Sequence, residues 1–297
     1  MEQRVASVDV EGTVERKLAD LRACMRELGS VLVCYSGGID SALVLAVAHA
    51  ELGPRAIGMT ATSASVLPLE VEEAKAIADG LGADHRIVAS NEIDDPDYRK
   101  NDVDRCFHCK SELYRLAESR RIAWNLEHVL NGTNVDDLGD HRPGLVAASE
   151  AGVKSPLVEL GFTKADVRDA ARAIGLSAWD KPAAACLSSR IPFGTEVTAA
   201  RLGKIGELET TLRGLGFQRV RVRFHPIPAS PGTVEGAIAR IELDPADVAR
   251  AASEELRDRI AQAGRDAGFT FVTVDLGGYR MGSHNAVLAS KSLPVLR

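Results

Sequence analysis

The sequence predicts an α/β protein, with a Rossmann-like parallel sheet covered by helices on both faces and a smaller C-terminal α+β domain. In the first half, short β-type runs alternate with amphipathic helical stretches, which is the pattern of a parallel sheet wrapped by helices. Beyond residue 191 this alternation stops. We therefore expect two domains, at residues 1–190 and 191–297.

Hydrophobic periodicity gives the elements of the first domain. Val14, Leu18 and Leu21 recur on one helical face, which predicts a helix over about residues 13–28. Thr163 and Asp166 have the spacing of a capping box, so a helix should begin at residue 164 and reach about 174. Strands are expected at 31–35, 55–60, 85–89 and 128–131, and helical stretches at 42–49, 69–81 and 110–122.

The second domain is expected to contain helices at 198–213 and 247–263 and strands at 219–224, 235–243 and 269–275. In the first of these strands, arginines at positions 219, 221 and 223 alternate with apolar residues, so one face of the strand is basic. Such a face is most often solvated. If it faces the domain junction, it becomes a site for a phosphate or a carboxylate.

Composition narrows the function classes. With 45% hydrophobic and 26% charged residues, the chain is typical of a globular protein, and it has no run of eighteen apolar residues and no signal-peptide pattern. We therefore expect a cytoplasmic protein without membrane contact. A net charge of −6 gives no general attraction to nucleic acid. Five cysteines, an odd number, indicate buried, catalytic or metal-bound thiols rather than a disulfide framework.

Residues 36–41, Ser-Gly-Gly-Ile-Asp-Ser, directly follow the first expected strand. Gly37 and Gly38 permit a tight turn in which backbone N–H groups approach an anion, while Ser36 and Ser41 add hydroxyl donors. The helix that follows directs its positive end at the same point. This pattern predicts a phosphate-binding turn, and it matches neither a Walker A loop nor a dinucleotide-binding fingerprint.

Two more loops follow expected strands, where ligands of parallel sheets bind. Residues 59–63 follow the second strand. Residues 132–144 follow the fourth and combine carboxylates, an amide and an arginine, which suits Mg²⁺ and phosphate, although a solvated polar loop with Asx turns has the same composition. Gly132 would let an adenine or a ribose approach the backbone.

Three cysteines are candidates for chemistry. Cys106 and Cys109 form a C-x-x-C pair in what is expected to be a polar connection, and Cys186 lies in the segment 181–190. They could bind a structural zinc ion completed by His108, or hold a [4Fe–4S] cluster with one iron open, or remain apart in space. Ser188, Ser189 and Arg190, beside Cys186, could hold a phosphate or a carboxylate next to a reactive sulfur. The remaining cysteines, 24 and 34, are expected to pack in the core.

Together these motifs resemble the LarE type of PP-loop ATP pyrophosphatase, the ATP-dependent sulfur transferases that make the nickel-pincer nucleotide cofactor of lactate racemase. The resemblance runs through residues 36–41, 132–144, 181–194 and the runs near 220 and 240, and therefore covers most of the chain. It implies an adenine nucleotide alpha hydrolase-like fold and a homo-oligomer. It also implies adenylylation of the carboxylates of pyridinium-3,5-biscarboxylic acid mononucleotide and replacement of AMP by sulfur, in two rounds.

The resemblance also implies residue roles. Asp40 would orient the loop or Mg²⁺, and the second domain would bind the substrate and form oligomer contacts. Cys186 would be catalytic, and Cys106 and Cys109 would join it as cluster ligands. The other residues implied are Ser36, Gly37, Gly38 and Ser41 for the phosphates of ATP, Gly132 and the Met59 backbone for adenosine, and Ser189, Arg190, Arg221 and Arg223 for the substrate.

The sulfur source differs within that family. In one form a single cysteine, here Cys186, gives up its own sulfur. In the other, three cysteines hold a [4Fe–4S] cluster that carries a replaceable sulfide. Cys106 and Cys109 favour the cluster form, because a replaceable sulfide permits repeated turnover. A PP-loop tRNA thiolase, an amidating PP-loop enzyme and a non-catalytic ATP-binding sensor are the rival interpretations.

Overall fold

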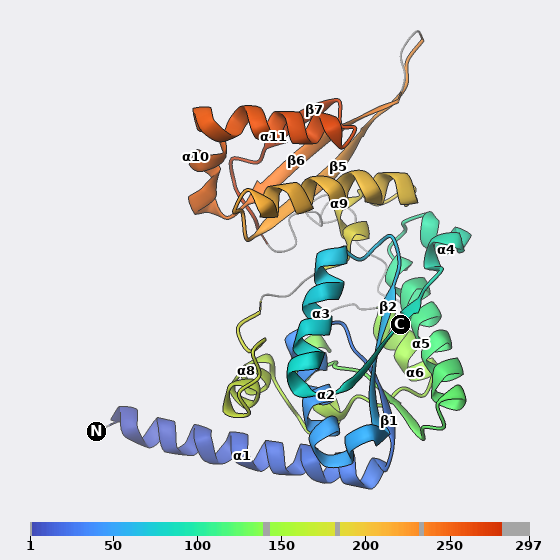
Figure 1. The fold of residues 1–297 in the computed structure, drawn as a ribbon, viewed down its shortest axis with the longest axis vertical. Coiled ribbons are helices and arrows are strands. Elements are labelled where there is room, and N and C mark those ends of the chain that lie inside the picture. The colour runs from blue at the N-terminus through green and yellow to red at the C-terminus, as the bar shows by residue number, and fades with distance from the viewer. Residues whose placement is uncertain (1, 139–142, 182–184, 232–234, 281–297) are drawn as a thin grey trace. The chain divides into compact units, whose positions relative to one another are not determined.

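The computed structural model describes residues 2–138, 143–181, 185–231 and 235–280, with side chains from residue 13 onward. The chain divides into two compact units (Figure 1), residues 1–98 with 104–184, and residues 99–103 with 185–297. The short segment 99–103 belongs to the second unit because Asn101 donates to the carbonyl oxygens of Pro192 and Thr195 at 2.8 and 2.9 Å. The division thus lies at 184/185, whereas the sequence led us to expect 190.

The first unit is built on a four-stranded parallel sheet in the order β3-β2-β1-β4. Its strands are β1 (Val31–Cys34), β2 (Ala56–Thr62), β3 (Asp84–Ala89) and β4 (His128–Leu130). The strand order reverses at β1, with β2 on one side of it and β4 on the other. Ligands of such sheets bind beyond the carboxyl end of the strand at which the order reverses, which is where residues 36–41 begin.

Helices cover both faces of this sheet (Figure 1), as predicted. Val31 and Val33 point into a core shared with α1, α2 and α8, whereas Leu32 and Cys34 point into a second core shared with α5 and α6. This alternation is what a strand buried on both faces requires. The helices are α1 (Glu2–Leu28), α2 (Ile39–Leu52), α3 (Pro68–Leu81), α4 (Pro96–Arg99), α5 (Arg105–Ala123), α6 (Pro143–Glu150), α7 (Pro156–Glu159) and α8 (Lys164–Ala173), with single turns η1 (Gly53–Arg55), η2 (Glu92–Asp94) and η3 (Val135–Asp137).

The predicted start of α8 is confirmed, since the Thr163 side chain accepts from the Asp166 N–H and the Asp166 carboxylate accepts from the Thr163 N–H. The expected polar connection around Cys106 and Cys109 was wrong. Both cysteines lie in the first turns of α5, which begins at Arg105. Their two thiols are three residues apart on one helix and therefore project from the same side of it.

The second unit is α+β, as predicted, with a three-stranded sheet in the order β5-β6-β7. β5 and β6 are antiparallel, and β6 and β7 are parallel. The expected helix over 247–263 is broken, because Ser253 is extended (ψ 154°) and a new helix begins after it. The elements are η4 (Leu187–Arg190), α9 (Ala199–Gly214), β5 (Val220–Ile227), β6 (Gly236–Leu243), η5 (Pro245–Asp247), α10 (Val248–Ala251), α11 (Glu254–Asp266) and β7 (Phe271–Val274).

The arginine face of β5 is not the solvated face that its alternating pattern most often indicates. Arg221 and Arg223 are only 8% and 6% exposed, and only Arg219, at the start of the strand, is open to solvent. The side chains on the other face, Val220 and Val222, are fully buried. Both faces of β5 are therefore covered, and the arginines must find polar partners inside the unit.

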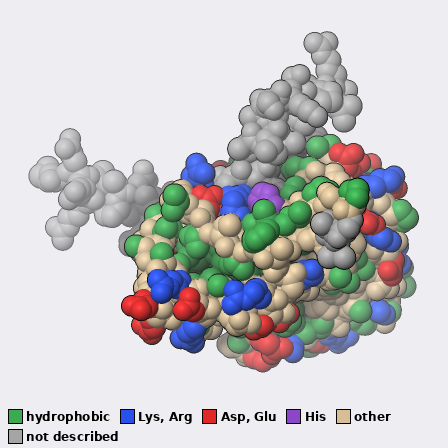
Figure 2. All heavy atoms as spheres, turned by 90° about the horizontal axis from the view of Figure 1, so that it is seen from above, with side chains coloured by type: hydrophobic (Ala, Val, Ile, Leu, Met, Phe, Trp, Pro, Cys, Tyr) green, Lys and Arg blue, Asp and Glu red, His purple; other side chains and the backbone are tan. Residues whose placement is uncertain are grey.

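None of the helices in the described ranges has an apolar stretch long enough to cross a membrane. On the face drawn in Figure 2, basic and acidic side chains are interspersed rather than gathered into one wide basic area. Binding to nucleic acid normally depends on a continuous basic surface, and this face offers none. The net charge of −6 points the same way.

Candidate functional site

Residues 36–41 form a turn between β1 and α2, as predicted. Gly37 has a φ of +70°, and a Cβ atom there would lie 2.7 Å from the Cβ of Ala74 in α3, so only glycine fits. Gly38 is the N-cap residue of α2 and makes no side-chain cap. The first N–H groups of α2 thus lack the side-chain acceptor that usually closes a helix start, which leaves them available to an anion.

Ser41 shapes this loop from inside. Its hydroxyl donates to the Gly38 carbonyl at 3.1 Å and accepts from the Ser36 N–H at 3.1 Å. The Ser41 side chain is buried, whereas Ser36 is exposed and lies 3.1 Å from it, hydroxyl to hydroxyl. The structure therefore places the predicted phosphate-binding residues in one loop and divides their roles, with Ser41 holding the turn and Ser36 facing outward.

Two residues that the sequence did not single out hold Asp40. Its carboxylate accepts from the Asn134 side chain at 3.0 Å and from the Lys164 ammonium at 2.5 Å. Asn134 begins η3, and Lys164 is the first residue of α8. In the structure the negative charge of Asp40 is balanced by Lys164, and a contact of Asp40 with Mg²⁺ stays a prediction.

The carboxylates of the loop after β4 bind backbone N–H groups, whereas the composition of the loop suggested Mg²⁺ and phosphate. Asp137 accepts from the Asn134 N–H at 3.1 Å, and Asp136 accepts from the Lys164 N–H at 2.8 Å. Both carboxylates thus cap backbone N–H groups, which is the Asx-type interpretation rather than the metal-binding one. The remaining candidates of this loop, residues 139–142, lie outside the described residues.

A second lysine lies at the rim of the loop. The Lys181 ammonium donates to the Gly37 carbonyl oxygen at 3.1 Å and pairs with Glu73 of α3 at 2.9 Å. Sequence reasoning missed Lys181 because its partners are distant in the chain. The only local signal was its place at the start of the segment 181–190, five residues before Cys186.

Of the two residues expected near adenosine, Gly132 follows β4, and Met59 lies within β2 beside Cys34, the last residue of β1. Both have structural roles there. A Cβ atom on Gly132 would lie 2.5 Å from the Ser41 nitrogen, so this glycine lets the exit of β4 pass over the first turn of α2. The Met59 carbonyl accepts from the Tyr35 N–H at 2.8 Å, and the Met59 side chain is fully buried. Contact of either residue with adenosine stays a prediction.

The exits of β2 and β3 are tied together by Glu92. This carboxylate is 4% exposed and accepts from the hydroxyls of Ser65 at 2.7 Å, Ser90 at 2.6 Å and Ser63. Three hydroxyl donors satisfy the buried carboxylate without a cation. The loop that follows β2, at the edge where a nucleotide would bind, is thereby fixed in place.

The C-x-x-C pair and the buried Cys34 differ in environment. Cys106 is exposed and Cys109 is partly buried, whereas burial raises the pKa of the Cys34 thiol to about 12. Cys34 is thus unreactive and belongs to the core, as predicted. Cys106 and Cys109 offer two thiols from one side of α5, which is the type of ligand that an iron–sulfur cluster uses. The donor set of the first unit therefore fits two of the three expected cluster ligands.

His108 does not join these cysteines. Its ring nitrogens lie 3.6 Å from carboxylate oxygens of Asp95 and Asp104, and Asp97 completes a group in which Asp95, Asp97 and His108 have ligand atoms within 4.8 Å. His108 also lines a polar cavity of about 400 Å³ with Asp95. A zinc site that needs His108 beside Cys106 and Cys109 is therefore not supported by the orientation of the ring.

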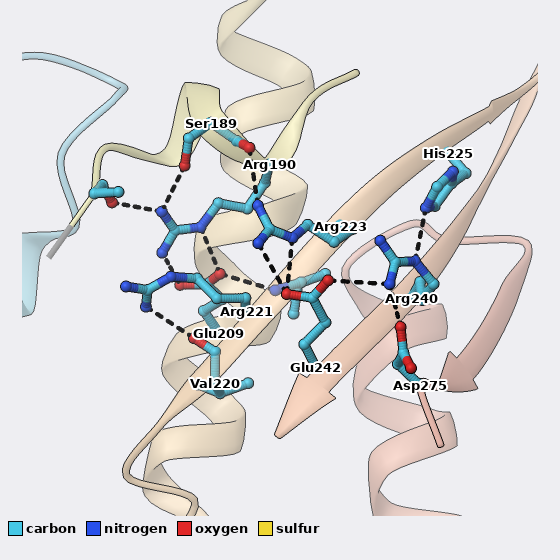
Figure 3. A network of polar contacts seen from close by, with 12 residues as sticks. Ser189, Arg190, Glu209, Val220, Arg221, Arg223, His225, Arg240, Glu242 and Asp275 are labelled. Carbon is cyan, nitrogen blue, oxygen red and sulfur yellow. Dashed lines mark hydrogen bonds and ion pairs between the residues drawn. The ribbon is translucent and has the colours of Figure 1, made fainter. Parts of the chain in front are cut away.

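In the second unit, Cys186 directly precedes η4 and is partly exposed. The guanidinium of Arg190 donates to the carbonyl oxygens of Cys186, at 2.9 Å, and Ala185. It also forms a two-pronged ion pair with Glu209, at 2.9 and 3.0 Å, and contacts the Ser189 hydroxyl at 3.1 Å (Figure 3). Arg190 and Glu209 are both 0% exposed. Arg190 is therefore occupied in holding the backbone at Cys186, which differs from the expected role of touching substrate.

The other predicted substrate residues continue this network (Figure 3). Arg223 donates to the Ser189 carbonyl at 3.0 Å and to Glu242 at 2.8 and 3.0 Å. Glu242 also pairs with Arg240 at 3.0 Å, and Arg240 pairs with Asp275. The structure thus brings all four predicted residues, Ser189, Arg190, Arg221 and Arg223, into one cluster within the second unit.

Arg221 is the member of this cluster that rests on an aromatic ring. Its guanidinium lies 5.5 Å from the ring centre of Tyr279 and donates to the Val220 carbonyl at 3.1 Å. Burial, and after it the nearby Arg190 charge, lower the pKa of Arg221. Contact of Arg221 with a substrate anion stays a prediction.

Comparisons with known proteins agree with this geometry. Residues 14–126 match the asparagine synthase family model. The chain is 36% identical, over 95% of its length and 98% of the relative, to the pyridinium-3,5-bisthiocarboxylic acid mononucleotide synthase of Lactiplantibacillus plantarum. It is 42% identical, over 93% of its length and 99% of the relative, to an uncharacterized protein of Synechocystis. One subunit of the glutamine-hydrolyzing GMP synthase of Archaeoglobus fulgidus is 27% identical over 68% of this chain and 66% of the relative.

Proposed function

Because this chain belongs to the LarE family of PP-loop ATP pyrophosphatases and is an ATP-dependent sulfurtransferase, we propose that it converts pyridinium-3,5-biscarboxylic acid mononucleotide into the dithiocarboxylate nucleotide. The observation that carries the proposal is the start of α2, where uncapped N–H groups lie behind the turn of residues 36–41. This site suits a triphosphate that is cleaved between the α- and β-phosphates. The product would serve the nickel-pincer nucleotide cofactor of lactate racemase.

In the first step, a substrate carboxylate oxygen attacks the α-phosphorus of ATP, and pyrophosphate leaves as the acyl-adenylate forms. The N–H groups of α2 and the exposed Ser36 would hold the phosphates, and Asp40 would face the Mg²⁺ that enters with ATP. Gly132 and the Met59 backbone would face adenosine. In the second step, a sulfur nucleophile attacks the activated carbonyl carbon and AMP leaves. Two rounds convert both carboxylates.

The second unit would bind the substrate's phosphate and carboxylates through Ser189, Arg221 and Arg223 and would carry oligomer contacts. Arg190 would act as a positioning residue, because its donors hold the Cys186 carbonyl and Glu209. Burial of Arg190 and Glu209 together makes this support rigid. Cys186, whose carbonyl Arg190 holds, would be the catalytic cysteine.

Cys106, Cys109 and Cys186 would hold a [4Fe–4S] cluster, which when bound supplies a replaceable sulfide as the sulfur donor. The alternative within the same reaction is that Cys186 attacks the acyl-adenylate, forms a thioester and loses its own sulfur, leaving dehydroalanine. The C-x-x-C pair on one side of α5, with Cys106 exposed and Cys109 partly buried, favours the cluster. In the cluster route Cys186 keeps its sulfur as an iron ligand, whereas in the sacrificial route Cys186 becomes dehydroalanine.

Mass spectrometry of the product tests the proposed reaction, and mass spectrometry of the protein tests the sulfur donor. Purified protein, ATP and the dicarboxylate nucleotide should give pyrophosphate, AMP and thiocarboxylate. Failure of wild-type protein to release pyrophosphate with this substrate would refute the proposed reaction.

Iron, acid-labile sulfide and the visible spectrum of anaerobically purified protein then identify the donor. A cluster of about four irons per chain that is lost in Cys106→Ala supports cluster ligation. Wild-type protein without iron after anaerobic reconstitution, together with a Cys186 that has lost the elements of H₂S, would instead establish the sacrificial route.

A further inference from the structure

The turn of residues 36–41 contains no basic residue. A Walker A loop carries a lysine that reaches the β- and γ-phosphates, and the departing pyrophosphate here bears a similar negative charge. Backbone N–H groups and Mg²⁺ supply part of the compensation. A cation from outside the loop would supply the rest, and the structure places two ammonium groups at this loop.

These two lysines differ in how firmly they are held. Lys164 forms an ion pair of 2.5 Å with Asp40, whose side chain is 22% exposed. Lys181 pairs with Glu73 at 2.9 Å, and this carboxylate is 38% exposed. The Lys181 ammonium is slightly less exposed than that of Lys164, 21% against 28%, but its ion pair is longer and its carboxylate is more exposed. Contacts to an exposed carboxylate are weakened by water, so the partner of Lys181 is the easier one to exchange. Lys164 is needed to balance Asp40, whereas Lys181 is the lysine that can turn to a ligand.

The second contact of Lys181 fixes its position relative to the phosphate-binding turn. Its ammonium lies 3.1 Å from the Gly37 carbonyl oxygen, within the turn itself. An ammonium group has three donors, and among the described residues Gly37 and Glu73 accept two of them. The third donor, or the one now bound to Glu73, is the one that a phosphate oxygen at the start of α2 would accept.

We propose that Lys181 binds the β- and γ-phosphates of ATP and the pyrophosphate that leaves, in place of the lysine that the loop lacks. This inference rests on the proposed function only in so far as ATP is the substrate. A charged hydrogen bond of this kind predicts a loss of about tenfold or more in affinity when the ammonium is removed. The loss should be confined to ligands that carry the β-phosphate.

Calorimetric titration of the full-length protein with Mg²⁺-ATP, Mg²⁺-pyrophosphate and AMP tests the proposal. Lys181→Met should bind ATP and pyrophosphate about tenfold or more weakly, and should bind AMP as wild type does. Lys204→Met is the matched control, because Lys204 also donates to a glycine carbonyl, that of Gly268 at 2.8 Å in the second unit. This control should leave all three affinities unchanged.

Glu73→Gln gives a readout that a purely structural role of Lys181 would not produce. Removing this carboxylate releases the ammonium from its competing partner, so pyrophosphate should bind more tightly than to wild type. The proposal is overturned if Lys181→Met binds pyrophosphate within about twofold of wild type, or if it loses AMP and pyrophosphate equally. Wild-type protein that binds no ATP would overturn the proposed function. Wild-type protein that binds ATP, with no loss of pyrophosphate binding in Lys181→Met, would overturn only the role of Lys181.

Discussion

The two units place positive charge in opposite ways. At the phosphate-binding turn, Lys164 and Lys181 are partly exposed, and each pairs with one partly exposed carboxylate. In the second unit, Arg190 and its partner Glu209 are both fully buried. Exposed pairs exchange partners at little cost, whereas buried pairs are fixed. The exposed pair of Lys181 suits a ligand that comes and goes, and the buried pair of Arg190 suits a support that must not move.

Breaking the buried pair should have the largest effect. Glu209→Ala leaves the Arg190 charge buried without its carboxylate, so the free energy of unfolding should fall by about 3–5 kcal/mol. Denaturant unfolding followed by circular dichroism measures it. Glu207→Ala, an exposed position on the same helix, should change stability by less than about 0.5 kcal/mol. A loss below about 1 kcal/mol for Glu209→Ala would mean that the two kinds of pair do not differ as described.

Packing at the turn gives the next effect. Gly132→Ala would bring a Cβ atom to 2.5 Å from the Ser41 nitrogen, which should reduce stability by about 1–3 kcal/mol and weaken ATP binding. The same unfolding measurement and an ATP titration detect both losses. Gly80→Ala is the matched control, since nothing lies within 4 Å of its added methyl group and the position is in helix α3. Normal ATP affinity in Gly132→Ala would show that the turn tolerates displacement.

Breaking the exposed pair should matter much less for stability. Lys164→Met removes the partner of Asp40, and because both side chains are partly exposed, unfolding should change by less than about 1 kcal/mol. Lys17→Met, which breaks the similarly exposed pair with Asp166, should behave alike. Denaturant unfolding of both variants beside Glu209→Ala measures the contrast directly. A loss in Lys164→Met as large as that in Glu209→Ala would contradict it.

The smallest effect concerns His225, at the end of the arginine network. Burial, and then Arg240, lower its pKa below the ordinary value of 6.5. The unfolded chain therefore binds this proton more readily, and the contribution of His225 to stability is lost as the pH falls below 6.5. Protonation also removes the acceptor for Arg240, whose Nε donates to His225 Nε2 at 3.1 Å. An NMR titration of the ring checks this. A midpoint at or above 6.5 would refute it.

Local patterns were sufficient to predict the strands, the capping box at Thr163 and the turn of residues 36–41. They failed where a partner is distant in the sequence. Asp40 is separated by 94 residues from Asn134 and by 124 from Lys164, and Lys181 is 144 residues from Gly37. Such contacts follow from the fold, and the spacing of residues within a short sequence segment does not predict them.

Strand β5 shows that local patterns also fail to predict whether a polar face is buried. The alternation at 219, 221 and 223 correctly gave two faces to β5, but it could not tell a solvated face from a buried one. Burial of Arg223 depends on Glu242, which comes from β6, and the Arg221 guanidinium lies over the ring of Tyr279. Likewise, the helical position of Cys106 was missed because a single polar stretch precedes α5, and Asp104 makes no side-chain cap that would mark its start.

Glu209 also protects the sheet of the second unit from association. β5 is an edge strand, and an edge strand with unsatisfied N–H groups can recruit a strand of another molecule. The Val222 N–H donates instead to the Glu209 carboxylate at 2.9 Å, inside the protein. The carboxylate that pairs with Arg190 thus also removes one donor from the open edge of this sheet, and we expect Glu209→Ala to make that edge more prone to association as the protein concentration rises.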